Sequence, residues 1–526
     1  MDEFVNSIKS EVIHLDNLDN ACAIFNIPTF FWYKNTSRSS WEQFMPPDIL
    51  KIAFYKALID FPILAGYIKT DSNGSSYIEI NKDNLNMPEY TDTDCDVDFE
   101  ALRSSGYNTK LLPNIFADKR IPPAPPGLYG GHIKMAAVNI FRLKDFSGVA
   151  LFISTSHCAV DGHGYCSFVG RWAEMARSLQ HLNLEGTPFP ECTFIHNRSF
   201  HHIDKYNDCN ELESSIQNFL SSGSFISRWM SRISSETRGR LFKGMSKLSK
   251  CKGLYFHISK DTLATLRESM KKYAGPDINR YSDNDILSAL IIMTIGQDMR
   301  NTADSKHDRS LAKTLCSSLG LKLGNTEDIM TMLAVDMRPR LGYQGIMNFM
   351  GNLAFSRHVT ISQDVLDTAN ITESLLAIAS SIRLAVDSTN KEYVRQYKYM
   401  YNKEPDCHIR HMLHNIKHKN KIMISSRTRF PYYKMDFGAG DPAKARPMFL
   451  AFPNVVVIMP CHPEDNGYEL AFSLSKDMVK KVLQNKLWMS LVDNVDNVST
   501  KQKRFFKQRL GWLGKWKNDG NKKKSE

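Results

Sequence analysis

The sequence has 526 residues, of which 42% are hydrophobic and 23% charged, and this length favours two domains over one compact core. Its longest apolar runs, residues 448–460 and 286–296, fall short of the roughly 20 residues that a membrane-spanning helix needs. The net charge of +11 does not indicate nucleic-acid binding, because residues 501–526 alone carry +8 and the rest of the chain only +3. The ten cysteines form no CxxC pair, which predicts reduced thiols and a cytoplasmic location, and no secretory signal is expected at the N-terminus.

The first half of the chain predicts helices and strands in alternation. Apolar residues recur every three or four positions over 46–68, which predicts a helix with one buried face. Residues 132–143 and 148–155 read as two strands joined by a turn, and a helix is expected after residue 162. The composition then turns polar from about 187 to 250, the best candidate for a crossover between domains.

The second half continues the same alternation. Ser282 and Asp285 have capping-box spacing, so a buried helix is expected to begin there. Predicted strands are 253–259, 328–338, 454–460 and 468–475, and predicted helices are 260–273, 282–299 and 371–386. Interleaved helices and strands in both halves indicate an α/β fold.

The stretch SHCAVDGHG (156–164) is the strongest candidate for chemistry. His157 ends an apolar strand, Asp161 and Gly162 follow, and a helix begins, a place where catalytic groups often lie. The HxxxD spacing alone is weak, because His257 and Asp261 share it at what reads as an ordinary strand-to-helix boundary.

Three interpretations of His157 follow from the residues. A neutral imidazole titrating near 6.5 can take a proton from an attacking hydroxyl or amine. The alternative is a loop histidine beside a turn-forming Asp-Gly pair. A third reading places a catalytic metal on His157, Asp161 and His163, although no HExxH motif supports it. No GxSxG elbow or glycine-rich phosphate loop is present.

A second stretch, ISSRTRFPYYKMDFGAGDPAKARP (424–447), complements the first. Together they resemble the HxxxDG and DFGWG motifs of the BAHD acyltransferases. Four further segments resemble conserved segments of that family and follow in the same order: 54–68, 334–341, 348–352 and 468–478. The resemblance covers about residues 14–485. The resemblance implies two similar α/β domains, each a mixed β-sheet flanked by helices, joined by a long crossover. We expect an N-terminal domain over 1–200, a linker over 201–250, a C-terminal domain over 251–500 and a basic tail over 501–526.

The resemblance also implies a reaction and roles for residues. Acyl-CoA would be a co-substrate, no cofactor would be permanently bound, and the acyl group would pass to a small-molecule alcohol or amine without a covalent acyl-enzyme. His157 would be the general base, and Asp161 would bond Arg338 to support the loop. The remaining motif residues would be structural: Gly162, Asp436, Gly438 and Gly440.

The chain departs from the family pattern at two positions of interest and keeps the family's residue type at a third. Ala439 replaces the tryptophan of DFGWG. Ser425 stands where the family has a hydroxyl that can donate to a developing oxyanion. Arg427 replaces a family tryptophan, which suggests an acceptor site for a polar or anionic group, the alternative being an arginine that faces solvent.

Other functional classes stay open at this point. One is a non-catalytic member that binds a ligand or partner in the same cleft, since a fold does not guarantee its usual function. Another is a metal-dependent hydrolase using HxxxDxH. The tail 501–526 could form a basic amphipathic helix in weak contact with an anionic membrane, or pack on the body. A monomer is expected.

Overall fold

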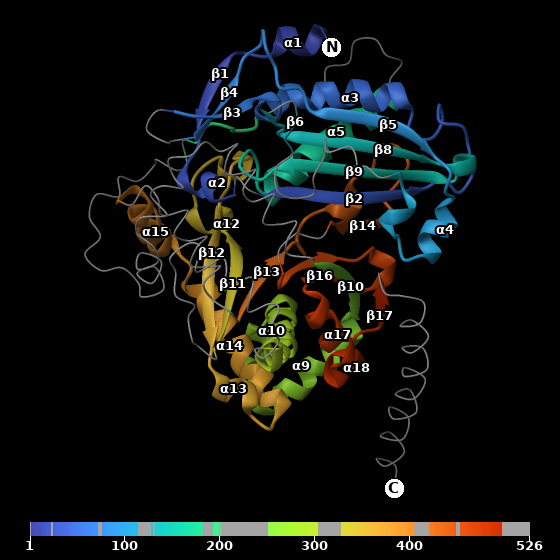
Figure 1. Ribbon diagram of the computed structural model, residues 1–526. Helices are drawn as coiled ribbons and strands as arrows, with labels where there is room; N and C mark the ends of the chain where they lie inside the picture. The colour runs from blue at the N-terminus through green and yellow to red at the C-terminus, as the bar shows by residue number, and fades with distance from the viewer. Residues whose placement is uncertain are drawn as a thin grey trace.

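The protein is described by a computed structural model that covers residues 2–22, 25–71, 76–113, 128–129, 132–181, 193–198, 200, 251–302, 328–403, 420–448 and 453–496. The predicted linker 201–250 and tail 501–526 lie outside the described residues. Two mixed β-sheets flanked by helices organise the fold, one in each half of the molecule (Figure 1). No helix in the described part of the chain has the length and apolar content to cross a membrane.

The first sheet has five strands, and its inner strands are buried on both faces. Their order is β14 (Lys444–Pro447), β2 (Asn26–Lys34), β9 (Gly148–Ser156), β8 (Ala136–Leu143) and β5 (Glu89–Cys95). Helices α3 (Pro47–Asp60) and α5 (Gly162–His181) pack together beside it (Figure 1). Trp172 of α5 is buried, and its Nε1 donates to the carbonyl of Leu50 at 2.9 Å, which holds the two helices in register.

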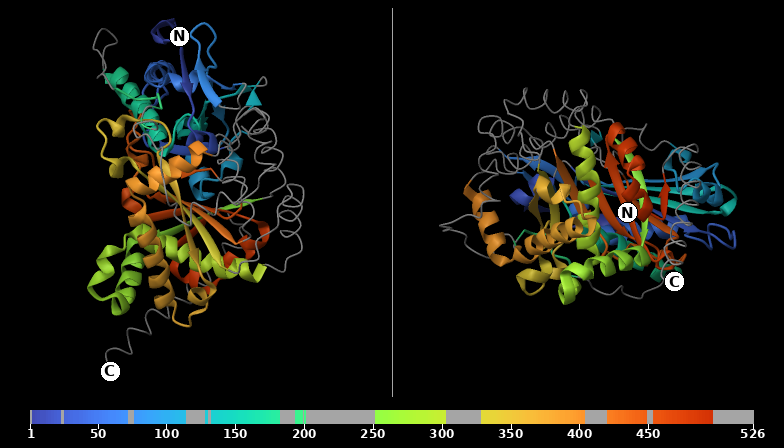
Figure 2. Two further views of the ribbon diagram at one scale, coloured as in Figure 1. Left: turned by 90° about the vertical axis from the view of Figure 1, so that its left-hand side faces the viewer. Right: turned by 90° about the horizontal axis from the view of Figure 1, so that it is seen from below.

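The second sheet has seven strands and its own apolar core. Their order is β12 (Ala354–Ile361), β11 (Ile329–Asp336), β13 (Lys421–Ser426), β15 (Val455–Pro460), β16 (Gly467–Leu474), β10 (Lys252–Ser259) and β17 (Asn494–Asp496). The helices that pack with it are α9 (Lys260–Ala274), α10 (Asp283–Thr302), α14 (Ile371–Ser388), α17 (Lys476–Gln484) and α18 (Lys486–Leu491). In the side view of Figure 2 its yellow-to-red strands lie below the blue and teal strands of the first sheet.

The other described elements are short. They are α1 (Asp2–Ser7), β1 (Glu11–His14), α2 (Asn17–Cys22), β3 (Tyr67–Thr70), β4 (Ser76–Ile80), α4 (Phe99–Ser104), β6 (Leu128–Tyr129), β7 (His132–Ile133), α12 (Arg338–Leu341), α13 (Gln363–Asp367) and α15 (Lys391–Lys403). Short 3-10 helices occupy Pro62–Ala65, Thr109–Leu111, Lys144–Phe146, Gly275–Arg280, Ile346–Asn348, Tyr432–Lys434 and Pro463–Asp465. Strands β1, β4 and β3 form a small separate sheet.

Local signals in the sequence account for many of these elements. The α/β class is confirmed, and α10 begins with the predicted capping box, in which the Asp285 amide donates to Ser282 Oγ and the Ser282 amide donates to Asp285 Oδ2. Ser259 caps α9 by accepting from the Thr262 amide, so His257 lies in the strand before an ordinary helix start.

One strand from the second half of the chain joins the first sheet. Strand β14 pairs antiparallel with β2, and Arg446 within it is buried. Arg446 Nε and Nη2 each bond Glu469 of β16 at 2.6 Å, while Nη1 donates to the Gly106 carbonyl at 2.7 Å. Burial opposes ionisation of Glu469, but the Arg446 and Lys444 cations outweigh it and hold its pKa at about 2. This buried charge cluster ties the two sheets together.

Candidate active site

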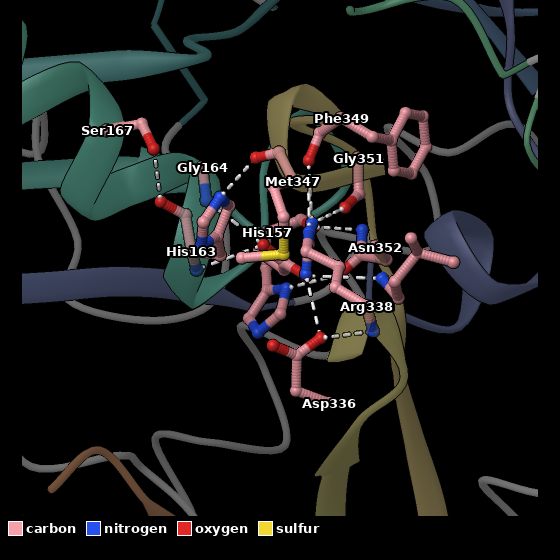
Figure 3. A network of polar contacts seen from close by, with 12 residues as sticks. His157, His163, Gly164, Ser167, Asp336, Arg338, Met347, Phe349, Gly351 and Asn352 are labelled. Carbon is pink, nitrogen blue, oxygen red and sulfur yellow. Dashed lines mark hydrogen bonds and ion pairs between the residues drawn. The ribbon is translucent and has the colours of Figure 1, made fainter. Parts of the chain in front are cut away.

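His157 lies where β9 ends, between the two halves of the molecule. Its backbone amide donates to the Phe25 carbonyl at 2.9 Å, so the residue stays at the end of the sheet. The residues after it turn, and α5 starts at Gly162. The imidazole is partly exposed and faces Asn352 from the second half of the chain (Figure 3).

Asn352 determines which ring nitrogen of His157 carries hydrogen. Its Nδ2 donates to the His157 carbonyl and to Asp19 Oδ1, both at 2.8 Å. Both partners are acceptors only, so the amide oxygen must be the atom 3.0 Å from His157 Nδ1. Since that oxygen cannot donate, Nδ1 is the donor. A neutral His157 therefore has its lone pair on Nε2.

A buried ion pair supports this arrangement from behind. Arg198 Nε donates to Asp19 Oδ2 at 2.7 Å, and both side chains are buried. Arg198 Nη2 also donates to the carbonyls of Cys158 and Ala159, at 3.0 and 3.1 Å, and so holds the turn that follows His157. The sequence interpretation missed Asp19 and Arg198, for which no motif was available. Asn352 ends one of the family landmarks but had no role assigned to it.

Asp161 points away from His157 and toward Arg338. Arg338 Nη1 donates to Asp161 Oδ2 at 2.8 Å, and the two residues are 1% and 2% exposed. Burial raises the pKa of Asp161, but Arg338 outweighs it and the pKa lies below its usual value. The pairing expected between these residues is present, and no hydrogen bond joins Asp161 to the imidazole within the described chain.

The carboxylate of Asp161 also organises backbone from both halves of the chain. Oδ1 accepts from the amides of His163 and Gly164, at 3.0 and 3.1 Å, as the first turn of α5 forms. Oδ2 accepts from the Leu353 amide at 3.2 Å. Asp161 therefore connects the start of α5 to the segment that carries Asn352.

Gly162 and Gly164 lie where neighbouring atoms leave no room for a side chain. A Cβ added at Gly162 would lie 2.6 Å from the Phe430 ring, and one at Gly164 would lie 2.5 Å from the Met350 carbonyl oxygen. Real Cβ atoms do not approach other atoms this closely, and the Met350 backbone has little freedom to move. The chain around Phe430 and around Met350 therefore packs directly against the start of α5.

Two predicted residues extend from β13 toward the same region. Ser425 pairs with Val457 of β15, and Arg427 follows with its amide donating to the Ile458 carbonyl at 2.8 Å. No described hydrogen bond joins Ser425 to His157. Partial shielding from solvent is the main cause that lowers the pKa of His157, and the positive charge of Arg427 lowers it further, against the raising effect of Asp161.

The DFGAG stretch lies at the other end of α5. Asp436 Oδ1 accepts from the amides of Gly438 and Gly440, both at 2.8 Å, and Gly438 has a left-handed φ of 91°. The Asp436 carbonyl accepts from Arg177, in the last turns of α5. With a rise of about 1.5 Å per residue, that position is roughly 20 Å along the helix from Gly162. The motif does not meet His157.

The geometry does not favour the metal interpretation. Asp161 has both oxygens engaged by Arg338 and backbone amides, and His163 Nε2 lies 2.8 Å from the Met347 carbonyl, to which it must donate. Within the described residues, no group of three His, Cys, Asp or Glu side chains is placed to hold a metal ion.

Comparison with known proteins agrees with this architecture. A family model described as "Transferase family" matches residues 6–218 and 311–487, well over half of the chain. The shikimate O-hydroxycinnamoyltransferase of Nicotiana tabacum is 23% identical over 473 residues, which cover 88% of this chain and 92% of that protein. The fatty alcohol:caffeoyl-CoA acyltransferase of Arabidopsis thaliana is 21% identical over 478 residues, covering 89% and 92%.

Solved structures show the same fold at low sequence identity. TRI101 of F. graminearum, complexed with coenzyme A and deoxynivalenol, has a TM-score of 0.65 and 17% identity, covering 92% of this chain and 99% of that one. Vinorine synthase has a TM-score of 0.56 and 16% identity, covering 92% and 98%. The chain therefore belongs to the BAHD family of transferases and is an acyl-CoA-dependent O- or N-acyltransferase.

Proposed function

We propose that His157 Nε2 is the general base of acyl transfer from acyl-CoA to a small-molecule alcohol or amine. Nε2 takes the acceptor proton as the acceptor oxygen or nitrogen bonds to the thioester carbonyl carbon. The tetrahedral adduct then breaks its C–S bond, and the imidazolium returns the proton to the CoA thiolate. CoA leaves as the free thiol, and no bond forms between the acyl group and the protein.

The observation that carries this proposal is the hydrogen bond of Nδ1 to Asn352 Oδ1 at 3.0 Å. It leaves the lone pair on Nε2 and orients the ring. The lowered pKa of His157 keeps that lone pair unprotonated near neutral pH. Asn352 and Asp19 would act as positioning residues, since each acts through the imidazole rather than on a substrate.

The other motif residues have supporting roles in this proposal. Ser425 is the candidate donor to the oxyanion, because its hydroxyl lies on β13 two residues before Arg427, whose charge acts on His157. The Asp161–Arg338 ion pair would hold the loop without relaying a proton. The turn formed by Asp436, Gly438 and Gly440 would dock the 430s segment on α5, away from the chemistry.

The names of related enzymes define a range of donors and acceptors for this enzyme. The names of the relatives include hydroxycinnamoyl and caffeoyl donors, with shikimate, putrescine, anthranilate and fatty alcohols as acceptors. We propose that this enzyme takes an acyl-CoA and a hydroxyl or amine acceptor within this chemical range. Arg427 in place of a tryptophan is the feature that would separate its acceptor from those of the relatives.

The test is release of free thiol from a panel of acyl-CoAs and acceptors. His157→Ala should abolish acceptor-dependent release while the protein melts as the wild type does. His257→Ala is the matched control, because it removes a histidine with the same HxxxD spacing and should keep full activity. Persistence of activity in His157→Ala would contradict the proposal, and loss of activity on chelation would favour the metal hydrolase. Absence of release with every pair would favour the non-catalytic alternative.

We also propose that the enzyme is a cytoplasmic monomer. Four cysteines within the described residues are buried thiols outside any disulfide, Cys95, Cys158, Cys166 and Cys461, as suits a reducing compartment. For the tail 501–526 two predictions stand, a helix on a membrane surface and a helix packed on the body of the protein. Co-sedimentation with anionic liposomes, comparing the full chain with one that ends near residue 500, distinguishes the two, and sedimentation velocity tests the monomer.

A further inference from the structure

We propose that Arg427 binds a carboxylate carried by one of the two reacting substrates, either the acceptor or the acyl chain. The inference rests on the proposed function, because it assigns a recognised group to the same site. Arg427 is a departure of this chain from its family, so the preference would be a property of this enzyme.

The guanidinium of Arg427 has few partners among the described residues. It is partly exposed, and its described hydrogen bond is from Nη1 to Tyr432 Oη at 3.4 Å, which is long. No ion pair joins it to a carboxylate within the described chain. The buried arginines differ, because five of them pair with carboxylates at 2.6–2.8 Å: Arg142, Arg171, Arg198, Arg338 and Arg446. Arg427 therefore retains most of its donors for a ligand.

The backbone and Tyr432 place this charge next to the candidate base. The Arg427 amide donates to the Ile458 carbonyl of β15, so the residue continues the line of β13 just beyond its last residue, Ser426. Tyr432 is fully buried in the core of the first half, and its hydroxyl accepts the long hydrogen bond from Arg427 Nη1. The side chain thus reaches from the second half of the molecule toward the first.

The electrostatic effects agree with this position. The charge of Arg427 is one of the causes that lower the pKa of His157. It also opposes the effect of burial, which raises the pKa of Cys166 near the start of α5. A substrate anion paired with Arg427 would offset that charge and make Nε2 more basic once the substrate is bound. A planar carboxylate suits the guanidinium fork, which can donate two parallel hydrogen bonds.

The experiment measures binding in the His157→Ala background, so that turnover does not enter. Calorimetry compares 3-hydroxybenzoate with its methyl ester for the acceptor arm, and malonyl-CoA with propionyl-CoA for the donor arm. In one arm the acid should bind about tenfold or more tightly than its neutral analogue, as a charge-assisted pair predicts. Arg427→Gln should remove this preference, and Arg427→Lys should keep only part of it. Arg429→Gln, an exposed arginine two residues on, is the matched control and should retain it.

Equal binding of acid and neutral analogue in both arms would overturn the inference, as would a preference that survives Arg427→Gln in a protein that melts normally. Failure of the proposed function looks different, because it appears as absence of thiol release in the wild type with the carboxylate preference intact. The arm in which the preference appears identifies which substrate carries the anion.

Discussion

The buried pair of Asp161 and Arg338 makes the sharpest prediction about how the catalytic loop is held. Asp161→Asn keeps the shape of the side chain but removes its charge, and it turns one acceptor atom into a donor. Each oxygen accepts two hydrogen bonds, so at least two of the four are lost. Arg338 loses its buried counter-ion but keeps Asp336 and the carbonyls of Phe349 and Gly351.

The expected loss of unfolding free energy is about 3 kcal/mol, the lower end for breaking a buried ion pair, because Arg338 keeps other partners. Urea unfolding followed by tryptophan fluorescence measures it. Asp336→Asn is the matched control, since it removes the other carboxylate on the same arginine, 40% exposed, and should cost under about 1 kcal/mol. Thiol release should also fall in Asp161→Asn, because the carboxylate that accepts hydrogen bonds from both the start of α5 and the segment of Asn352 is lost.

Two results would refute this reasoning. One is a loss under about 1 kcal/mol in Asp161→Asn, and the other is an equal loss in the two variants. A double-mutant cycle of Asp161→Asn with Arg338→Met isolates the pair, and its coupling should carry most of the effect.

Three further outcomes are expected. Asn352→Ala should lower kcat about tenfold to a hundredfold with little change in KM for acyl-CoA, because the ring loses its orientation, whereas the exposed Asn348→Ala should leave kcat unchanged. The value of kcat/KM should be constant above pH 6.5 and fall below it, because the pKa of His157 is lowered and the base is protonated only on acidification. A value of kcat/KM that still rises above pH 7 would contradict this. The pKa of Glu469, lowered from 4.5 to about 2, makes its stabilisation complete above pH 4.5 and lost as the pH falls toward 2, so Glu469→Gln should flatten the urea midpoint across that window.

Sequence patterns predicted the helices and strands whose ends are set by interactions between residues close together in the chain. The start of α10 followed from Ser282 and Asp285, which bond each other across one turn. Strand β2 was missed although it is an inner strand of the first sheet. Eight of its nine residues are buried, from Asn26 to Tyr33, so the alternation of polar and apolar residues that identifies a half-exposed strand is absent. Strand β14 was missed as a member of the first sheet, because its partner β2 lies about 400 residues earlier.

The sequence by itself determined that His157 ends a buried strand, that Asp161 and two glycines follow, and that a helix begins there, since all of these depend on contiguous residues. Only the tertiary structure decided which ring nitrogen holds the lone pair. That property depends on Asn352, 195 residues away, whose amide is in turn oriented by Asp19, 333 residues from it. Contacts at such separations exist only after both halves have folded and packed, and no local pattern encodes them.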